Sequence, residues 1–303
     1  MEIRYIDRVT KKEEIEKVYG KFFIQFFYGH HAFSKIFAFA LNLICRIPFF
    51  SRLYGRIQKN GFSKRKIKPF IEEYQVDATE FLEPVSSFNS FNDFFVRKLR
   101  MSTRPMNEDI AVAVLPADAR YRVYANIHGS DGYLVKGKKF SLEKLLDNAT
   151  LAHKYLYGAM VFARLCPVDY HRFHFPCHCV PNESRLINGA LFSVNPMALK
   201  RNIDIVTENK RMITELQTKH FGTVLYIEVG ATYVGSICQT YTPGQHYAKG
   251  DEKGYFEFGG SMLILIFPPF RIQFDQDLLD ATQRGIEVKG LLGQSLGRAL
   301  SSP

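Results

Sequence analysis

From residue 110 onward, the chain consists of short apolar runs separated by glycine, proline and polar turn residues. The runs have the length of β-strands and the spacing typical of antiparallel sheets. They cover residues 110–115, 121–127, 159–165, 189–194, 224–229, 232–237 and 261–267. Residues 141–146 and 197–199 have helical character, and the tail 278–300 fits either pattern. The pattern predicts an α+β fold with a mainly antiparallel β core, arranged as a sandwich or a flattened barrel.

The N-terminal part has a different, amphipathic pattern. After an aromatic run at 22–28, the stretch 32–50 places apolar side chains on one broad helical face, and a narrow opposite stripe is polar. The stripe consists of Lys35, Asn42 and Arg46. A lysine or arginine at the bilayer centre costs about 2.5–3.5 kcal/mol, and Pro48 ends the helix early. We therefore predict a helix that lies in the membrane interface rather than one that spans it. The alternative is a helix packed on the protein's own core.

Charge favours an anionic surface as the partner of this segment. The 303-residue chain has a formal net charge of +10 at pH 7. Basic residues directly follow the amphipathic stretch: Arg52, Arg56, Lys59, Lys64, Arg65, Lys66 and Lys68. Each adds about 1 kcal/mol of attraction when it lies close to anionic lipid; the alternative is a solvated basic loop. No nucleic-acid partner is expected, because the sequence has no zinc-finger spacing, aromatic RNA-binding signature or leucine heptad.

The cysteines indicate neither a disulfide framework nor a metal site. Cysteines occur at positions 45, 166, 177, 179 and 238, an odd number without framework spacing, which indicates reduced thiols in a reducing compartment. Cys177-His178-Cys179 lies near His174 but lacks the C-x2-C spacing of zinc sites, and no second ligand pair follows. We therefore expect no metal site. Reduced thiols together with the amphipathic stretch favour a peripheral protein at the cytoplasmic face of the cell membrane.

The most specific chemistry is carried by Gly259-Gly260-Ser261, directly before the apolar run 262–267. Glycine leaves its carbonyl unshielded and adopts dihedral angles closed to other residues, so the Ser261 hydroxyl can reach the Gly260 carbonyl. Attack there would move the acyl group from nitrogen to oxygen. Elimination from the ester would cut the chain, and hydrolysis would leave a pyruvoyl group at residue 261. The simpler alternative is a glycine bulge at the start of a buried strand.

Self-cleavage of this kind needs a base for the Ser261 proton, and one proline-bounded segment offers two histidines. His171 and His174 lie three residues apart, and histidine titrates near neutrality. Asp118, at the predicted end of a strand, would orient the base and stabilise its protonated form. Asp169 is the rival for that role, although its nearness to His171 makes triad geometry harder to form. Each residue also has a structural alternative, as a core histidine or a turn aspartate.

These residues together resemble the phosphatidylserine decarboxylase family, pyruvoyl-dependent enzymes that make phosphatidylethanolamine. The likeness runs from about residue 88 to 270 and keeps the family's order of motifs. The motifs are Phe91-x-x-Phe94-Phe95-x-Arg97-x-Leu99, Arg104-Pro105, Pro116-Ala117-Asp118, Val135-Lys136-Gly137, Asp169-Tyr170-His171-Arg172-Phe173-His174-Phe175-Pro176, Gly189-Ala190-Leu191-Phe192-Ser193-Val194-Asn195-Pro196, Glu208-Asn209-Lys210-Arg211, Val229-Gly230-Ala231-Thr232 and Lys253-Gly254-Tyr255-Phe256-x-Phe258-Gly259-Gly260-Ser261. Several long motifs in one order are far more specific than Gly-Gly-Ser alone.

The resemblance implies a role for each candidate residue. Ser261 would be the precursor of a covalent pyruvoyl cofactor, His174 the base of the self-cleavage triad, and Asp118 its orienter. His171 would be the proton donor in decarboxylation, after the substrate's amine has formed a Schiff base with the pyruvoyl group. The product would be phosphatidylethanolamine and CO2. The substrate, phosphatidylserine, would come from an anionic membrane.

The resemblance also implies a proenzyme that cuts itself between Gly260 and Ser261. The products would be a large β chain, 1–260, and a small α chain, 261–303, which form a heterodimer with a possible further pairing of two such heterodimers. We expect two regions, an N-terminal helical, membrane-associating region over 1–105 and a β-rich catalytic domain over 106–303. Met262 and Ala119 depart from the family's usual Thr and Gly, but neither change removes a reacting group.

Two other classes of function stay open at this stage. One is an unprocessed serine hydrolase that uses Asp118, His174 and Ser261. It lacks the Gly-x-Ser-x-Gly elbow, because position 263 is leucine. The other is an inactive peripheral lipid-binding homologue, which the departure at Met262 prompts.

Overall fold

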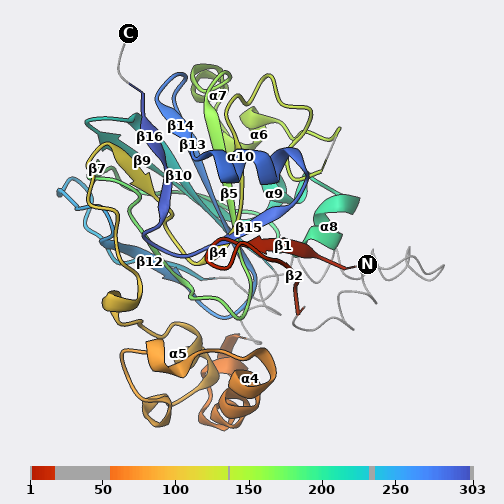
Figure 1. Ribbon diagram of the computed structural model, residues 1–303, viewed down its shortest axis with the longest axis vertical. Helices are drawn as coiled ribbons and strands as arrows, with labels where there is room; N and C mark the ends of the chain where they lie inside the picture. Colours follow the sequence, from red (N-terminus) through yellow and green to blue (C-terminus); the bar gives the residue numbers. More distant parts are fainter. Residues whose placement is uncertain (1, 18–54, 136, 232–235, 301–303) are drawn as a thin grey trace.

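The computed structural model describes residues 2–17, 55–135, 137–231 and 236–300. Over these ranges the chain has an α+β fold in which β-sheets and short helices form layers (Figure 1). The aromatic run 22–28 and the amphipathic stretch 32–50 lie outside the described residues, so the membrane-binding helix stays a prediction. Among the helices of the described ranges, none combines the length and apolar character needed to cross a bilayer.

The largest sheet organises the molecule. In the described residues it has ten strands in the order β2-β1-β15-β4-β5-β13-β10-β9-β7, with β8 also paired to β9. These strands are β1 (Arg4–Asp7), β2 (Glu13–Ile15), β4 (Ala119–Tyr124), β5 (Ala159–Leu165), β7 (Cys179–Pro181), β8 (Arg185–Ile187), β9 (Arg211–Thr218), β10 (Gly222–Gly230), β13 (Ser261–Phe267) and β15 (Glu287–Gly290). β1 runs parallel to β15 and the other pairs are antiparallel, so the sheet is mixed. The mainly antiparallel β core is confirmed.

Both faces of this sheet are covered. One face packs against the sheets β11-β12-β6 and β14-β16-β3 and against helix α10, and the other packs against four short helices. The first layer comprises β3 (Val112–Val114), β6 (Arg172–His174), β11 (Ile237–Gln239), β12 (Glu252–Phe256), β14 (Ile272–Phe274), β16 (Ser295–Ala299) and α10 (Gln276–Gln283); the second comprises α6 (Leu142–Leu146), α7 (Ala149–Lys154), α8 (Pro196–Arg201) and α9 (Ile205–Glu208). The arrangement is therefore a sheet sandwich with an added helical layer.

Strand β13 explains why its sequence is an unbroken apolar run. Side chains alternate across a strand, so Leu263 and Leu265 enter the core between the sheets while Ile264 and Ile266 enter the core under the helices. A strand buried on both faces needs apolar residues at every position. β13 also lies between β5 and β10, which fixes both of its edges.

A smaller helical part precedes β3 in the chain and is drawn in orange in Figure 1. It contains η1 (Gly61–Lys66), α4 (Ile67–Tyr74), η2 (Ala78–Glu80), η3 (Val85–Ser87), α5 (Phe91–Phe95) and η4 (Met101–Thr103). Its core is aromatic: the rings of Phe70, Phe91 and Phe94 meet one another at centroid distances of 5.3–5.7 Å. Phe258, just before the Gly-Gly-Ser segment, packs on Phe91 at 5.2 Å and on Phe95 at 4.9 Å. The helical part thus contacts the predicted cleavage site.

Two expectations about elements need correction. The predicted strand at 189–194 is a loop with a single bridge, Ala190 to Asn209, because the Asn209 side chain bonds both the N–H and the C=O of Phe192 and takes the place of a neighbouring strand. The first 17 residues, assigned to a helical region, contribute β1 and β2 to the main sheet. Within the described residues, the predicted strand at 232–237 overlaps β11 at a single residue, Ile237. The helices predicted at 141–146 and 197–199 are confirmed as α6 and α8.

Candidate active site

Ser261 is the first residue of β13 and is fully buried. It pairs with Gly230 of β10 on one side and Leu165 of β5 on the other. Two residues earlier, Gly259 has a φ of +143°, a conformation that residues with a Cβ avoid. By the alternation along β13, the Ser261 side chain lies on the face of Leu263, where β6 and β12 pack. The glycine pair therefore turns the chain into the strand and presents a hydroxyl beneath the smaller sheet.

His171 is the imidazole that meets this hydroxyl. Ser261 Oγ lies 3.4 Å from His171 Nδ1, and Nε2 of the same ring lies 2.9 Å from the carbonyl oxygen of Cys166. A carbonyl only accepts, so Nε2 carries the proton and Nδ1 is left as the acceptor for the Ser261 hydroxyl. The ring stacks on Phe95 with 3.9 Å between centroids. Burial lowers the pKa of His171 to about 3, so the imidazole is neutral at pH 7.

His174 is held by other partners. Its Nδ1 donates to the carbonyl of Gly250 at 2.9 Å, and its Nε2 lies 3.3 Å from the hydroxyl of Tyr170, which therefore donates to it. Burial lowers the pKa of His174, while the nearby charge of Asp118 acts in the opposite direction. In the described residues, no hydrogen bond links His174 to Ser261 or to Asp118. The structure thus brings His171 to Ser261 and leaves His174 beside them with a different set of contacts.

Asp118 is buried just before β4 and is bound by an arginine. Arg104 donates to its carboxylate at 2.7–3.1 Å from Nε and Nη2 and also binds Glu80, while the backbone N–H of Leu292 donates at 2.8 Å. The His174 main chain lies close by, since its N–H donates to the Pro116 carbonyl at 2.8 Å. Asp118 therefore acts on His174 through its charge rather than through a hydrogen bond.

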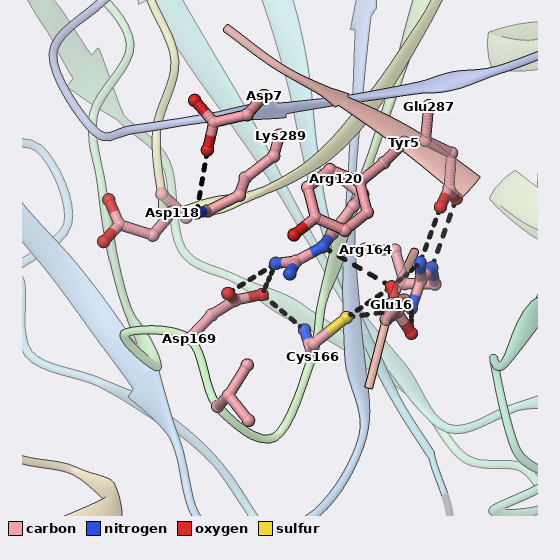
Figure 2. A network of polar contacts seen from close by, with 12 residues as sticks. Tyr5, Asp7, Glu16, Asp118, Arg120, Arg164, Cys166, Asp169, Glu287 and Lys289 are labelled. Atoms are coloured by element: carbon pink, nitrogen blue, oxygen red, sulfur yellow. Dashed lines mark hydrogen bonds and ion pairs between the residues drawn. The ribbon is translucent and has the colours of Figure 1, made fainter. Parts of the chain in front are cut away.

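The sequence analysis missed a buried ionic network beside His171, shown in Figure 2. Arg120 of β4 and Arg164 of β5 are neighbours in register. Arg120 binds Asp169, and Arg164 binds Glu16 and Glu287. All five side chains are at most 6% exposed. The available signal was an arginine inside each of two apolar strands, because a buried guanidinium requires carboxylate partners.

The cysteine cluster does not converge on a common point. Cys177 and Cys179 are buried in the core between the sheets, whereas His178 between them is exposed. In the part of the chain that the structure describes, no group of three or more His, Cys, Asp or Glu residues has the geometry to hold a metal ion.

Comparison with known proteins identifies the family of the chain. The family profile described as phosphatidylserine decarboxylase matches residues 91–298, a range that contains every candidate residue. The chain belongs to the phosphatidylserine decarboxylase family. It is 49% identical to a phosphatidylserine decarboxylase proenzyme of Chlamydia pneumoniae over 98% of this chain and 97% of the relative. It is 49% identical to one of Chlamydia caviae over 98% of both, and 43% identical to one of Chlamydia trachomatis serovar D over 99% of both.

Proposed function

We propose that the chain is a phosphatidylserine decarboxylase proenzyme that makes its own pyruvoyl group at Ser261 and converts phosphatidylserine to phosphatidylethanolamine and CO2. The observation that carries the proposal is the 3.4 Å contact between Ser261 Oγ and His171 Nδ1 at a buried Gly-Gly-Ser segment in a member of this family. The relatives are named proenzymes, which supports a step of self-processing.

Processing would begin when the Ser261 hydroxyl attacks the Gly260 carbonyl carbon and gives its proton to an imidazole. The C–N bond between the two residues breaks as the ester forms, and the freed amine takes up the proton. Loss of the α proton of residue 261 then expels the Gly260 carboxylate and leaves a dehydroalanine. Its hydrolysis releases ammonia and leaves the ketone of the pyruvoyl group, with Gly260 at the end of the large chain.

We assign His174 as the base of this step and Asp118 as the residue that supports its protonated form, on the motif match. Burial lowers the pKa of His174, and the charge of Asp118 opposes this lowering and so favours the protonated form. In the uncut chain, however, Ser261 contacts His171. His174 would have to exchange its Tyr170 contact for Ser261 before it could act.

Single substitutions of the two histidines test this assignment. His174→Ala should stay a single uncut chain, whereas His171→Ala should cut itself and then decarboxylate poorly. Removing a general acid or base typically costs a factor of about 10²–10⁴. Intact mass measurement follows the cut, and CO2 release follows turnover. A His171→Ala protein that stays uncut beside a cut His174→Ala protein would reverse the two roles.

In turnover, a pyruvoyl group at residue 261 would supply an electron sink for the electrons left when CO2 departs. The site fits this group, since a methyl and a ketone oxygen replace the hydroxymethyl and amine of Ser261 and add no bulk to a fully buried position. His171 would protonate the substrate carbon. Burial keeps its pKa at about 3, so it would gain that proton only beside an anionic headgroup, whose charge raises the pKa.

The headgroup would reach this site after the cut rather than before it. Ser261 and His171 are both fully buried in the uncut chain. Breaking the bond after Gly260 frees the end of the segment that covers them, and this segment includes Phe258 with its packing on Phe95. Self-cleavage would therefore both create the reactive group and open the way to it.

The two chains would stay together as a heterodimer. β13 lies between β5 and β10, and the tail adds β14, β15 and β16 to two sheets, so the small chain 261–303 supplies central parts of the core. Pairing of two such heterodimers remains part of the proposal, as does the division into regions 1–105 and 106–303, except that β1 and β2 of the first region belong to the main sheet.

The protein would work as a peripheral protein at the cytoplasmic face of the cell membrane, where an anionic lipid surface holds its substrate. A groove in the helical part supports this, since it is lined by Phe62, Lys64, Arg65 and Lys68, and Phe62 is 76% exposed. An exposed ring among cations suits the boundary between acyl chains and phosphate headgroups. The amphipathic stretch 32–50 would add to this attachment.

Intact mass of the purified protein tests the proposed function directly. Wild type should give two chains, 1–260 and 261–303, the second blocked by a pyruvoyl group, and should release CO2 from phosphatidylserine vesicles. Ser261→Ala should give one full-length chain and no CO2. A wild-type protein that remains uncut and inactive, or an uncut chain labelled by a serine-reactive phosphonate, would contradict the proposal.

A further inference from the structure

The orientation of His171 depends on one backbone carbonyl. Its Nε2 donates to the Cys166 carbonyl, and this bond keeps the Nδ1 lone pair available to residue 261. If the proton moved to Nδ1, the ring could no longer accept a proton from the Ser261 hydroxyl at that nitrogen. The placement of the Cys166 carbonyl therefore decides which form of the imidazole residue 261 meets.

Asp169 holds Cys166 at both of its backbone groups. Its carboxylate oxygen Oδ2 accepts from the Cys166 N–H at 2.7 Å, and its own N–H donates to the Cys166 carbonyl at 2.9 Å. The same carbonyl thus accepts from Asp169 and from His171. The turn that begins at Cys166 is closed by these two bonds, and His171 follows two residues after it.

Two arginines in turn hold Asp169. Arg120 of β4 donates to both carboxylate oxygens from Nη1, and Arg97 donates to the Asp169 carbonyl at 3.2 Å. The side chains of Arg120 and Asp169 are 4% and 6% exposed, so the pair is shielded from water. Glu16 lies 3.5 Å from Arg120 Nε and joins it to Arg164 (Figure 2). The turn is therefore attached to the centre of the main sheet.

Among the described residues, the carboxylate of Asp169 makes no hydrogen bond to an imidazole. Its hydrogen-bond partners among the described residues are Arg120 and the Cys166 N–H, so it is not the orienter of a triad. Burying a carboxylate and a guanidinium together brings little net stability, because desolvation offsets much of the attraction. A buried ion pair that holds the turn before His171 is better explained by a role in positioning than by a contribution to stability.

We propose that Asp169 and Arg120 are positioning residues, which hold the turn after Cys166 so that the Nδ1 lone pair of His171 stays directed at residue 261. This rests on the proposed function for the use made of His171, but the orientation of the ring is a property of the uncut chain. Asp169→Asn removes the charge that binds Arg120 and keeps an oxygen for the Cys166 N–H. Arg120→Lys keeps a cation but loses the planar guanidinium, whose Nη1 binds both Asp169 oxygens while its Nε faces Glu16.

Glu228→Gln is the matched control. Glu228 forms a fully buried pair with Lys253, and among the described residues neither side chain makes a hydrogen bond or ion pair with the turn. The change is again a buried carboxylate to an amide. A role that is only structural predicts that Asp169→Asn and Glu228→Gln behave alike once their stabilities are matched.

The first measurement needs no catalytic activity. In Ser261→Ala protein with ¹⁵N-labelled histidine, NMR should report His171 with its proton on Nε2. Adding Asp169→Asn or Arg120→Lys should give a mixture of tautomers, and adding Glu228→Gln should leave the spectrum of His171 unchanged. An unchanged His171 in both positioning variants, or an equal change with Glu228→Gln, overturns the proposal.

The second measurement uses the cut enzyme acting on phosphatidylserine vesicles. Asp169→Asn should lower kcat by on the order of 10- to 100-fold with KM little changed, as a misplaced reacting group does. Arg120→Lys should fall between it and wild type, and Glu228→Gln should keep wild-type kcat. Wild-type kcat in Asp169→Asn contradicts the positioning role. Absence of decarboxylation in wild type would instead contradict the proposed function and leave the NMR result to decide on positioning.

Discussion

At the scale of single residues, the site depends on what surrounds one hydroxyl. Ser261 follows a glycine, and its hydroxyl lies 3.4 Å from an unprotonated ring nitrogen of His171. Neighbouring glycines have separate tasks. Gly259 has a positive φ, whereas the space at Gly260 is open, with Ala231 and Val194 no nearer than 3.8 Å to a built Cβ. Gly259 therefore serves conformation, and Gly260 serves access to its carbonyl.

A pair of alanine variants separates these tasks. In uncut Ser261→Ala protein, Gly259→Ala should lower the free energy of unfolding by about 1–3 kcal/mol, because a Cβ is strained at this φ. Gly260→Ala should change it by less than about 1 kcal/mol. With Ser261 restored, Gly260→Ala should still slow self-cleavage, since its methyl group shields the carbonyl. Urea unfolding and intact mass are the measurements, and equal stability of the two variants would contradict the assignment.

Burial of His171 also makes stability depend on pH. The folded pKa of about 3 lies below the ordinary value of 6.5, so the unfolded chain binds a proton first as the pH falls. The stability that the protein gains by keeping His171 neutral is fully present above pH 6.5. It is lost between pH 6.5 and 3, at up to about 1.4 kcal/mol per pH unit. Uncut Ser261→Ala protein should therefore lose stability over this range more steeply than the same protein with His171→Gln. Parallel pH profiles from urea unfolding would exclude this effect.

At the scale of elements, the site is made where a short helix, a loop and a strand end meet. α5 supplies Phe95, which stacks on His171, and β13 supplies Ser261. α5 has only five residues, so its stability depends on its cap and packing more than on its own hydrogen bonds. The Ser90 hydroxyl caps it by accepting from the Asp93 N–H at 3.1 Å.

Ser90→Ala should therefore weaken the platform under His171. Loss of an N-cap costs about 0.5–2 kcal/mol. The matched control is Ser141→Ala, which removes the same kind of cap from α6 on the opposite face of the main sheet. Both variants should lose similar stability in thermal unfolding, but only Ser90→Ala should lower decarboxylation. Equal activity of the two would show that α5 does not support the site.

At the scale of the whole molecule, cutting the chain does not divide the fold. The small chain includes β13, whose seven residues are all buried between two strands of the large chain. Burial of an aliphatic side chain contributes about 1.5–3 kcal/mol, so this strand alone holds the fragments firmly.

The cut protein should therefore behave as one particle. Native mass spectrometry should give the summed mass of the two chains, and denaturing electrophoresis should separate them. Leu263→Ala and Ile264→Ala, one facing each core, should each weaken the association by about 2–5 kcal/mol. Spontaneous release of the small chain from wild type under native conditions would contradict this prediction.

Much of the core and two helices of the helical layer, α6 and α8, could be predicted, while α7, α9, the N-terminal strands and the ionic network could not. The run at 159–165 became β5 and the run at 261–267 became β13 without a shift of either end, because strands buried on both faces are apolar throughout. The segment 189–194 has the same composition, yet the Asn209 side chain took the place of its strand partner. β1 was missed because its partner β15 lies about 280 residues away, beyond the reach of local patterns.

The sequence by itself supplied the groups of the proposed chemistry: a Gly-Gly-Ser segment before a buried strand, two histidines in one loop, and a set of motifs in the order of one family. These are local features, and local order of residues is what a sequence states directly. Only the tertiary structure decided that His171, rather than His174, contacts Ser261, that Arg104 binds Asp118, and that Arg120 binds Asp169. Such contacts join residues 14 to 90 positions apart, and their geometry follows from how the strands align in the folded sheet.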